Sequence, residues 1–418
     1  MKYILALNCG SSSLKYTLFE LLEGNHLHSI IEGVVEEIGN IERSRIKMKA
    51  KGEKEVRDMP LPSHKEALEA VFELFNEHNI NKEGICGVGH RVVHGGTQYN
   101  SSVCIDTHVK ETIKELFPIA PLHNPPNLLG IEVAMGLLPE VKHVAVFDTA
   151  FHATLPEYAY RYGIPQSWYE EFGVRTYGFH GTSHMYVAKR GAKFLGLDAS
   201  VFNGITAHLG NGCSLTKIEN GQSVDTSMGF TPLEGVIMGT RSGDIDPAVI
   251  SHVTDSLIKK ENISHEEAFK KVMYALNKAS GLKALGGTNM MQDIRRKAEA
   301  GDLEAETVIA IYAYRIAKYI GAYWATLPSC DALIFTAGLG ENEGYVRKKI
   351  LGFLSNIDFE VMDASNQVRG EEIQIARSEK NNMAVLVIPT DEEAVIGYDT
   401  LYLGYLGEGI PKVYPFED

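Results

Sequence analysis

Two similar stretches of sequence, LNCGSSSLK (residues 7–15) and LGNGCSLTK (residues 209–217), are the main basis for predicting the fold. In both, an apolar strand runs into a turn of small residues, and a second strand follows. A further pair, VFDTA at residues 146–150 and IFTAG at residues 334–338, comes in the same order within each half. Two collinear matches favour a duplicated domain with a cleft between the copies.

The first half reads as strands followed by alternating helices and strands. Strands are predicted over residues 3–7, 14–22 and 29–38, and a solvated strand pair or loop over 47–57. Apolar residues at 67, 68, 71, 72, 74 and 75 have the helical period and predict a helix over 64–78. A strand at 84–93, a helix at 107–117 and a strand at 142–147 follow. This order predicts an α/β fold, with a mixed sheet covered by helices.

After Pro156 a similar order begins again. Helices are predicted over 182–195, 266–279 and 303–326, with another after Glu343, and strands over 204–209, 214–219, 332–336 and 384–388. A last helix, from Glu392 to about residue 403, begins behind Thr390 and Asp391, which are favourable N-cap residues.

Length and composition narrow the class of protein. A chain of 418 residues favours two domains. The net charge of −14 argues against nucleic acid or an anionic membrane as the main partner. The five scattered cysteines lack metal-ligand spacing, which indicates reduced thiols. No apolar run reaches the ~20 residues of a membrane span. We therefore expect a soluble, cytoplasmic protein.

Three turns of small residues could bind phosphate, at residues 8–13, 210–214 and 338–342. Where side chains are small, backbone N–H groups can approach an anion closely. The sequence contains neither GxxxxGK(S/T) nor a strand followed by GxGxxG, so it does not predict a P-loop or Rossmann site. Turns of this kind in both halves predict instead a nucleotide held in an interdomain cleft.

Basic side chains occur in three further motifs. HRVVHGG (90–96) places Arg91 at the end of a buried strand, and MGTRSGDIDP (238–247) places Arg241 in a glycine-rich loop. YGFHGTSH (177–184) places His180 and His184 near the start of a helix, while PLHNPPN (121–127) and FDTAFH (147–152) add polar groups at predicted strand ends. Any one of these could be an ordinary loop residue. Together they suit a phosphate or carboxylate ligand at the strand ends of an α/β sheet.

These blocks, with HLGNGCS (208–214), DTSMGFTPLEGVIMGTRSGDIDP (225–247), FTAGLGEN (335–342) and PTDEE (389–393), run in the order of the acetokinase family, which the chain resembles from residue 7 to residue 393. The resemblance implies a fold of the actin-like ATPase superfamily, with duplicated actin-like (ribonuclease H-like) domains at residues 1–151 plus 391–418 and at 152–390. It implies phosphoryl transfer between ATP and acetate with Mg²⁺, which Mn²⁺ can replace. It also implies a homodimer formed through the second domain, and neither a nucleic-acid nor a membrane partner.

The resemblance further implies a role for individual residues. Asn8 and Glu392 would hold Mg²⁺ through its water shell, with Glu393 as the alternative to Glu392. The implied catalytic residues are Asp148, Arg91, Arg241, His180 and His123. The implied nucleotide-binding residues are Lys15, His208, Leu209, Gly210, Asn211, Gly212, Asp293, Ile294, Arg295, Gly338, Leu339, Gly340, Glu341 and Asn342. The stretch SGLKALGGTNMMQDIR (280–295) is longer than the family's usual adenosine-binding stretch and leaves the base preference open.

The acyl pocket that the resemblance implies contains Arg91 and four apolar residues: Val93, Leu122, Phe179 and Pro232. A valine at 93 leaves little room for a longer chain, which favours acetate over propionate. Acetate is ionised at neutral pH, so its attack on phosphorus needs no base, and Asp148 is expected to orient Arg91 or the metal's water shell. The alternatives are a propionate or butyrate kinase of the same family and an actin-like ATPase acting as a filament or chaperone.

Overall fold

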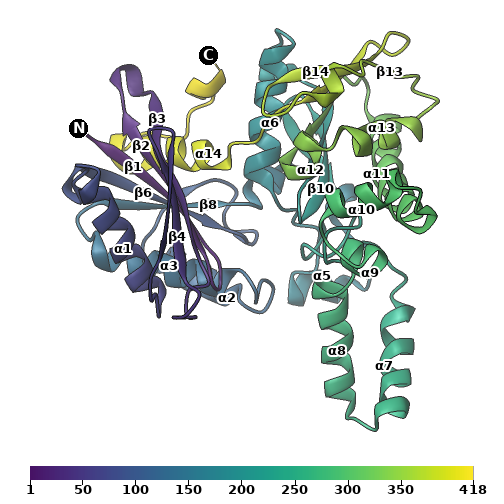
Figure 1. The fold of residues 1–418 in the computed structure, drawn as a ribbon, viewed down its shortest axis with the longest axis horizontal. Helices are drawn as coiled ribbons and strands as arrows, with labels where there is room; N and C mark the ends of the chain where they lie inside the picture. The colour runs from purple at the N-terminus through teal and green to yellow at the C-terminus, as the bar shows by residue number, and fades with distance from the viewer. Residues whose placement is uncertain (418) are drawn as a thin grey trace. The chain divides into compact units, whose positions relative to one another are not determined.

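The computed structural model describes residues 1–417, and the chain divides into two compact α/β units (Figure 1). Unit 1 comprises Met1–Ala153 and Asp391–Asp418, and unit 2 comprises Thr154–Thr390. The first boundary therefore follows residue 153, where the sequence predicts residue 151. Among the helices of residues 1–417, none is long and apolar enough to cross a membrane.

Unit 1 contains an eight-stranded mixed sheet in the order β5-β4-β3-β2-β1-β6-β8-β7. Strands β1 to β5 form an antiparallel meander, β6 and β8 continue parallel to β1, and β7 is antiparallel to β8. The central strand β1 is buried and apolar along most of its length, whereas the edge strand β5 is charged and largely exposed. The strands are β1 (Tyr3–Cys9), β2 (Leu14–Leu21), β3 (Leu27–Glu36), β4 (Arg45–Ala50), β5 (Glu53–Asp58), β6 (Ile85–Val92), β7 (Val103–Cys104) and β8 (Lys142–Phe147).

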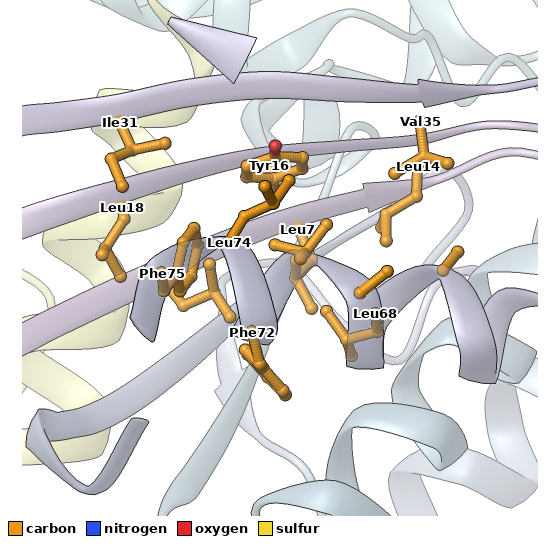
Figure 2. Close-up of a cluster of buried hydrophobic side chains, with 14 of the residues drawn as sticks. Leu7, Leu14, Tyr16, Leu18, Ile31, Val35, Leu68, Phe72, Leu74 and Phe75 are labelled. Carbon is orange, nitrogen blue, oxygen red and sulfur yellow. The ribbon is translucent and has the colours of Figure 1, made fainter. Parts of the chain in front are cut away.

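Helices cover both faces of this sheet. They are α1 (His64–Glu77), α2 (Thr107–Glu115), α3 (Asn124–Leu137) and α14 (Glu392–Asp399), which continues as the π-helical segment η6 (Thr400–Leu406). Helix α1 starts at the N-cap Ser63 and buries all six predicted apolar positions in the core that it shares with β1 to β3, where Figure 2 shows Phe75 beside Leu18. Figure 1 shows α14 on the opposite face, where it packs on β1 and β6.

Unit 2 contains a seven-stranded mixed sheet in the order β11-β10-β9-β12-β15-β14-β13. Strands β9, β12 and β15 are parallel, and β10 and β11 continue antiparallel from β9. The strands are β9 (Gly204–Leu209), β10 (Cys213–Glu219), β11 (Gln222–Thr226), β12 (Ala332–Thr336), β13 (Glu360–Val361), β14 (Ile373–Ser378) and β15 (Met383–Val387). The helices are α4 (Glu157–Tyr160), α5 (Gln166–Phe172), α6 (Gly181–Phe194), α7 (Ala248–Glu261), α8 (His265–Lys278), α9 (Gly281–Gly286), α10 (Met291–Glu299), α11 (Leu303–Thr326), α12 (Ala337–Asn342) and α13 (Gly344–Gly352).

The two sheets share one strand order, which supports the predicted duplication. In each unit, an antiparallel run of three strands, β3-β2-β1 or β11-β10-β9, ends in the first of three adjacent parallel strands, β1-β6-β8 or β9-β12-β15. This order makes β1 equivalent to β9, as the sequence predicts, but β6 equivalent to β12 and β8 equivalent to β15. The predicted match of VFDTA with IFTAG is therefore wrong, because it pairs strands at different positions in the two sheets.

Two predicted turns or strand ends are helix starts in the structure. Residues 338–342 lie in the short helix α12, which begins directly after β12. PLHNPPN leads into α3, with His123 at the N-cap position and prolines in the first turn. Proline is compatible with this turn because its missing N–H would have no helical partner there. The strand pair expected near residues 47–57 is present as β4 and β5.

Candidate active site

In unit 1, Arg91 and Asp148 form a bidentate ion pair at the ends of two parallel strands. Arg91 lies in β6 beside Val146 of β8, and Asp148 follows β8 directly. The Arg91 Nε donates to Asp148 Oδ1 at 2.9 Å, and Nη2 donates to Oδ2 at 2.6 Å. Burial opposes the charge of Arg91, but the adjacent Asp148 carboxylate raises its pKa overall. Asp148 is 1% exposed and uses both oxygens to fix one guanidinium.

Two asparagines at the start of α3 hold the chain that follows Arg91. Asn127 Oδ1 accepts from the Val93 N–H at 3.1 Å, and its Nδ2 donates to the Cys9 carbonyl at 2.8 Å. Asn124 binds both backbone groups of His94 in the same manner. The amide side chains therefore fix the end of β6 relative to the end of β1.

Asn8 and Lys15 are register partners on β1 and β2, so their side chains project from the same face of the sheet. Glu392 is the first residue of α14. Burial raises the pKa of its carboxyl group, the charge of Arg91 lowers it, and the charge of Asp148 raises it further. Its Oε1 is buried without a hydrogen-bond partner among the described residues. A buried carboxylate oxygen and a carboxamide are oxygen ligands that fit a hard cation that retains most of its waters. The residues present thus fit the implied Mg²⁺ site, although residues 1–417 contain no cluster of three or more acidic, His or Cys ligands.

In unit 2, His180 and Arg241 converge on Gly212. A Cβ placed on Gly212 would lie 3.3 Å from His180 Nε2 and 3.4 Å from Arg241 Nη1. His180 stacks on His208 with ring centroids 4.1 Å apart. It has a left-handed backbone, φ 56°, which is uncommon for a residue with a side chain and is typical of functional sites. Arg241 is held by the Pro232 carbonyl, to which Nη1 donates at 3.0 Å.

The predicted phosphate turn lies between β9 and β10 and contacts two other predicted segments. The Gly239 N–H donates to the Asn211 carbonyl at 3.0 Å, and Asn289 Nδ2 donates to Asn211 Oδ1 at 3.3 Å. A Cβ on Gly239 would lie only 2.1 Å from Asn211 Oδ1, so a side chain there would displace the Asn211 carboxamide. The loop of Arg241 and the stretch 280–295 are thereby brought to Asn211.

The remaining nucleotide candidates lie on helices of unit 2. Gly338, Leu339, Gly340, Glu341 and Asn342 lie in α12, whose first residue, Ala337, has a left-handed conformation, φ 63°. Glu341 Oε1 accepts from the Thr390 N–H at 3.1 Å. Asp293, Ile294 and Arg295 lie in α10, where Ile294 is fully buried. Only Asp293 and Arg295 of these three have partly exposed side chains, and Arg295 Nε lies 3.1 Å from Glu343 Oε2.

The four candidate acyl-pocket residues differ in environment. Val93 and Phe179 are buried, with 6% and 2% of their surfaces exposed, whereas Pro232 is half-buried and Leu122 is 53% exposed. Val93 follows β6 in unit 1, and Phe179 and Pro232 belong to unit 2. His123, at the N-cap position of α3, is partly buried.

Sequence reasoning missed several residues that hold the site together. Asn124 and Asn127 stand inside the quoted motif PLHNPPN, but nothing local shows that they bind the chain near Arg91. Thr206, in the strand predicted at 204–209, and Ser214, in the predicted phosphate turn 210–214, contact His184, and the sequence does not predict either contact. The prolines of PLHNPPN, followed by apolar residues at helical spacing, are the signal that could have located α3.

Comparison with known proteins gives one consistent family. The family model described as the acetokinase family matches residues 3–398. An acetate kinase from Thermosipho melanesiensis is 47% identical over 95% of this chain and 96% of that protein. An acetate kinase from Carboxydothermus hydrogenoformans is 44% identical over 96% of this chain and 98% of that protein.

Two solved structures are also similar over nearly their whole length. A propionate kinase from Francisella tularensis superposes with a TM-score of 0.87 and 39% identity, covering 96% of this chain and 99% of that chain. An acetate kinase from Porphyromonas gingivalis superposes with a TM-score of 0.86 and 39% identity, with the same coverage. These likenesses support the two-unit α/β fold.

Proposed function

Because the chain belongs to the acetokinase family, we propose that it catalyses reversible transfer of the γ-phosphoryl group of ATP to acetate, giving acetyl phosphate and ADP. The observation that carries this proposal is the match to acetate kinases over at least 95% of the chain. A bond forms between an acetate oxygen and the γ-phosphorus, and the bond from that phosphorus to ADP breaks.

The geometry of unit 1 suits an orienting role for Asp148. Both of its oxygens accept hydrogen bonds from Arg91, and acetate has no proton to give up. General-base catalysis is therefore not required of it. The pair uses Nε and Nη2 of Arg91, and Nη1 takes no part in it, so that Nη1 is assigned to the anionic substrates.

In unit 2, Arg241 and His180 are assigned to the transferring phosphoryl group, whose equatorial oxygens carry the charge in the transition state. Residues 208–212 are assigned to the ATP phosphates, with Asn211 closest. Asn8 and Glu392 would hold Mg²⁺, which supplies charge neutralisation at the phosphates when bound.

Hydroxamate formation tests the activity and the alternatives together. With ATP and hydroxylamine, we expect acetate to give the highest kcat/KM, propionate a lower value and butyrate the lowest. A preference for propionate, as the name of the Francisella relative suggests for that protein, would make this chain a propionate kinase. ATP hydrolysis without hydroxamate from any acid would favour the actin-like ATPase alternative. Dimer formation through unit 2 stays a prediction, which sedimentation equilibrium would test.

A further inference from the structure

A chain of three buried polar side chains runs from the sheet of unit 2 to the partly buried His180. Thr206 Oγ1, on β9, lies 2.7 Å from His184 Nδ1. His184 Nε2 lies 2.7 Å from Ser214 Oγ, and Ser214 Oγ lies 2.8 Å from His180 Nδ1. Thr206, His184 and Ser214 have no exposed surface. Because solvent does not reach them, their hydrogens must be matched within the chain.

The number of hydrogens fixes the direction of this chain. Ser214 has one hydroxyl hydrogen and two imidazole neighbours, so it donates to one ring and accepts from the other. Thr206 Oγ1 has no other hydrogen-bond partner within residues 1–417. If His184 donated to Thr206, the Thr206 hydroxyl hydrogen would be buried and unpaired, which costs about 1–3 kcal/mol. Thr206 therefore donates to His184, His184 to Ser214, and Ser214 to His180.

We propose that Ser214, His184 and Thr206 are positioning residues that keep His180 neutral, with its hydrogen on Nε2. This inference rests on the proposed function, in which His180 meets the phosphoryl group. The Nε2 edge of His180 lies beside Gly212 and Arg241. A ring with its hydrogen on Nε2 donates to a phosphoryl oxygen, whereas the other tautomer would present a lone pair to an anion.

Nitrogen NMR of the ¹⁵N-histidine-labelled full chain, without substrates, tests the proposal directly. We expect His180, assigned by the loss of its signals in His180→Gln, to carry hydrogen on Nε2 and none on Nδ1. Ser214→Ala and Thr206→Val should each turn this pattern into a mixture of tautomers, and Thr206→Ser should restore it. Hydrogen on Nδ1 in the wild type, or an unchanged His180 tautomer in Ser214→Ala or Thr206→Val, would overturn the proposal.

Thr216→Val is the matched control. Thr216 is the cross-strand partner of Thr206 and is equally buried, but its hydroxyl lies 3.1 Å from Thr226 Oγ1 instead of a histidine. We expect Thr216→Val to leave the His180 tautomer unchanged. If Thr216→Val shifts the tautomer as far as Thr206→Val does, general loosening of the strands explains both results. The relay, that is, the hydrogen-bond chain from Thr206 to His180, is then rejected. If Ser214→Ala fails to fold, the comparison of Thr206→Val with Thr216→Val still tests the proposal.

Steady-state kinetics give a second measure. Ser214→Ala should lower kcat by about 10–100-fold, a common cost of losing a group that orients a functional histidine. The KM for ATP should stay unchanged, because the relay affects the His180 Nε2–H donor and does not affect nucleotide binding. An equal rise in KM with constant kcat would contradict the assignment. If the wild type makes no acetyl phosphate, the proposed function fails, and the tautomer is still read separately by NMR.

Discussion

Arg91 and Arg241 carry the same charge but are held in opposite ways. Arg91 lies on a strand and is fixed by both oxygens of the buried Asp148 carboxylate. Arg241 lies in a glycine-rich loop, and its Nη1 donates to the Pro232 carbonyl at 3.0 Å. Charge therefore positions the first arginine, and close backbone packing positions the second. Unit 1 should be sensitive to changes of charge and unit 2 to changes of volume.

The buried histidines of the two units show a related contrast. In unit 1, His143 Nε2 donates to the Leu138 carbonyl at 3.1 Å, so its Nδ1 accepts from His90 Nε2 at 2.9 Å. Burial lowers the pKa of both rings. This pair ends on the Leu138 carbonyl inside the unit, which indicates a structural role. The relay of unit 2 ends at His180, beside Arg241, and reads as part of the site.

The largest expected effect is the loss of either arginine. Arg91→Ala and Arg241→Ala should each lower kcat by on the order of 10³–10⁵, as for other phosphoryl-transfer enzymes that lose a charge-stabilising arginine. ATP binding, followed by calorimetry, should survive in both. A variant that keeps more than about a tenth of wild-type turnover would remove that arginine from the proposed mechanism.

A smaller effect is expected from added volume in unit 2. Gly212→Ala would place a methyl group 3.3 Å from His180 Nε2 and 3.4 Å from Arg241 Nη1, so both side chains must move. A misplacement of about 1 Å can cost about 10²-fold in rate, so this shift of a few tenths of an ångström should lower kcat, measured with saturating substrates, by less than that. Gly352→Ala is the control, because no atom lies within 4 Å of its added Cβ. If Gly212→Ala and Gly352→Ala lower kcat equally, an added methyl group at Gly212 does no more harm than one at the surface.

Removal of the buried Glu392 carboxylate tests the proposed Mg²⁺ site. Glu392→Ala should raise the Mg²⁺ concentration for half-maximal activity by about 10–100-fold, because it removes a buried oxygen with no protein partner. Titration of activity against Mg²⁺ measures this shift, and Glu393→Ala is the comparison. If only Glu393→Ala moves the midpoint, the metal-binding residue is Glu393.

The acyl pocket should show a change in specificity. Val93 is buried, and Asn127 fixes its backbone. Val93→Ala should raise the ratio of kcat/KM for propionate to that for acetate by about tenfold, because one methylene is worth roughly 1–3 kcal/mol in an apolar pocket. The hydroxamate assay with both acids gives the ratio. An unchanged ratio would place Val93 outside the pocket.

The smallest effect concerns the buried carboxyl of Asp399, which is held by two hydroxyl groups. Asp399 accepts from Ser102 at 2.6 Å and from Tyr414 at 2.7 Å, and burial raises its pKa to about 6. The unfolded chain has a value near 3.9. Between about pH 4 and 6 the folded state binds more protons than the unfolded state, so this group makes stability fall as pH rises, by at most about 1.4 kcal/mol per pH unit.

Asp399→Asn should therefore flatten the pH dependence of the unfolding free energy across that window while leaving turnover unchanged. Urea unfolding at several pH values measures the slope, and the exposed Asp255→Asn is the control. An unaltered slope in Asp399→Asn would mean that Asp399 is ionised throughout this range in the folded protein.

The sequence by itself determined the elements whose pattern is local. The helical period at residues 67–75 predicted the buried face of α1, and the apolar run 204–209 matches β9. It also determined the family, because the motifs recur in fixed order along the chain. The spacing of apolar residues along the chain indicates which face of a strand or helix is buried. Predicting these elements therefore needs no knowledge of distant residues.

The tertiary structure alone decided which distant residues meet. That β12 matches β6 and not β8, that Asn127 ties Val93 to Cys9, and that Thr206 reaches His180 through Ser214 all depend on pairing across the fold. A hydrogen bond needs its two atoms within about 3 Å in a suitable direction. Residues far apart in the chain reach such positions only when sheets and helices have packed, so their partners leave no pattern in the sequence.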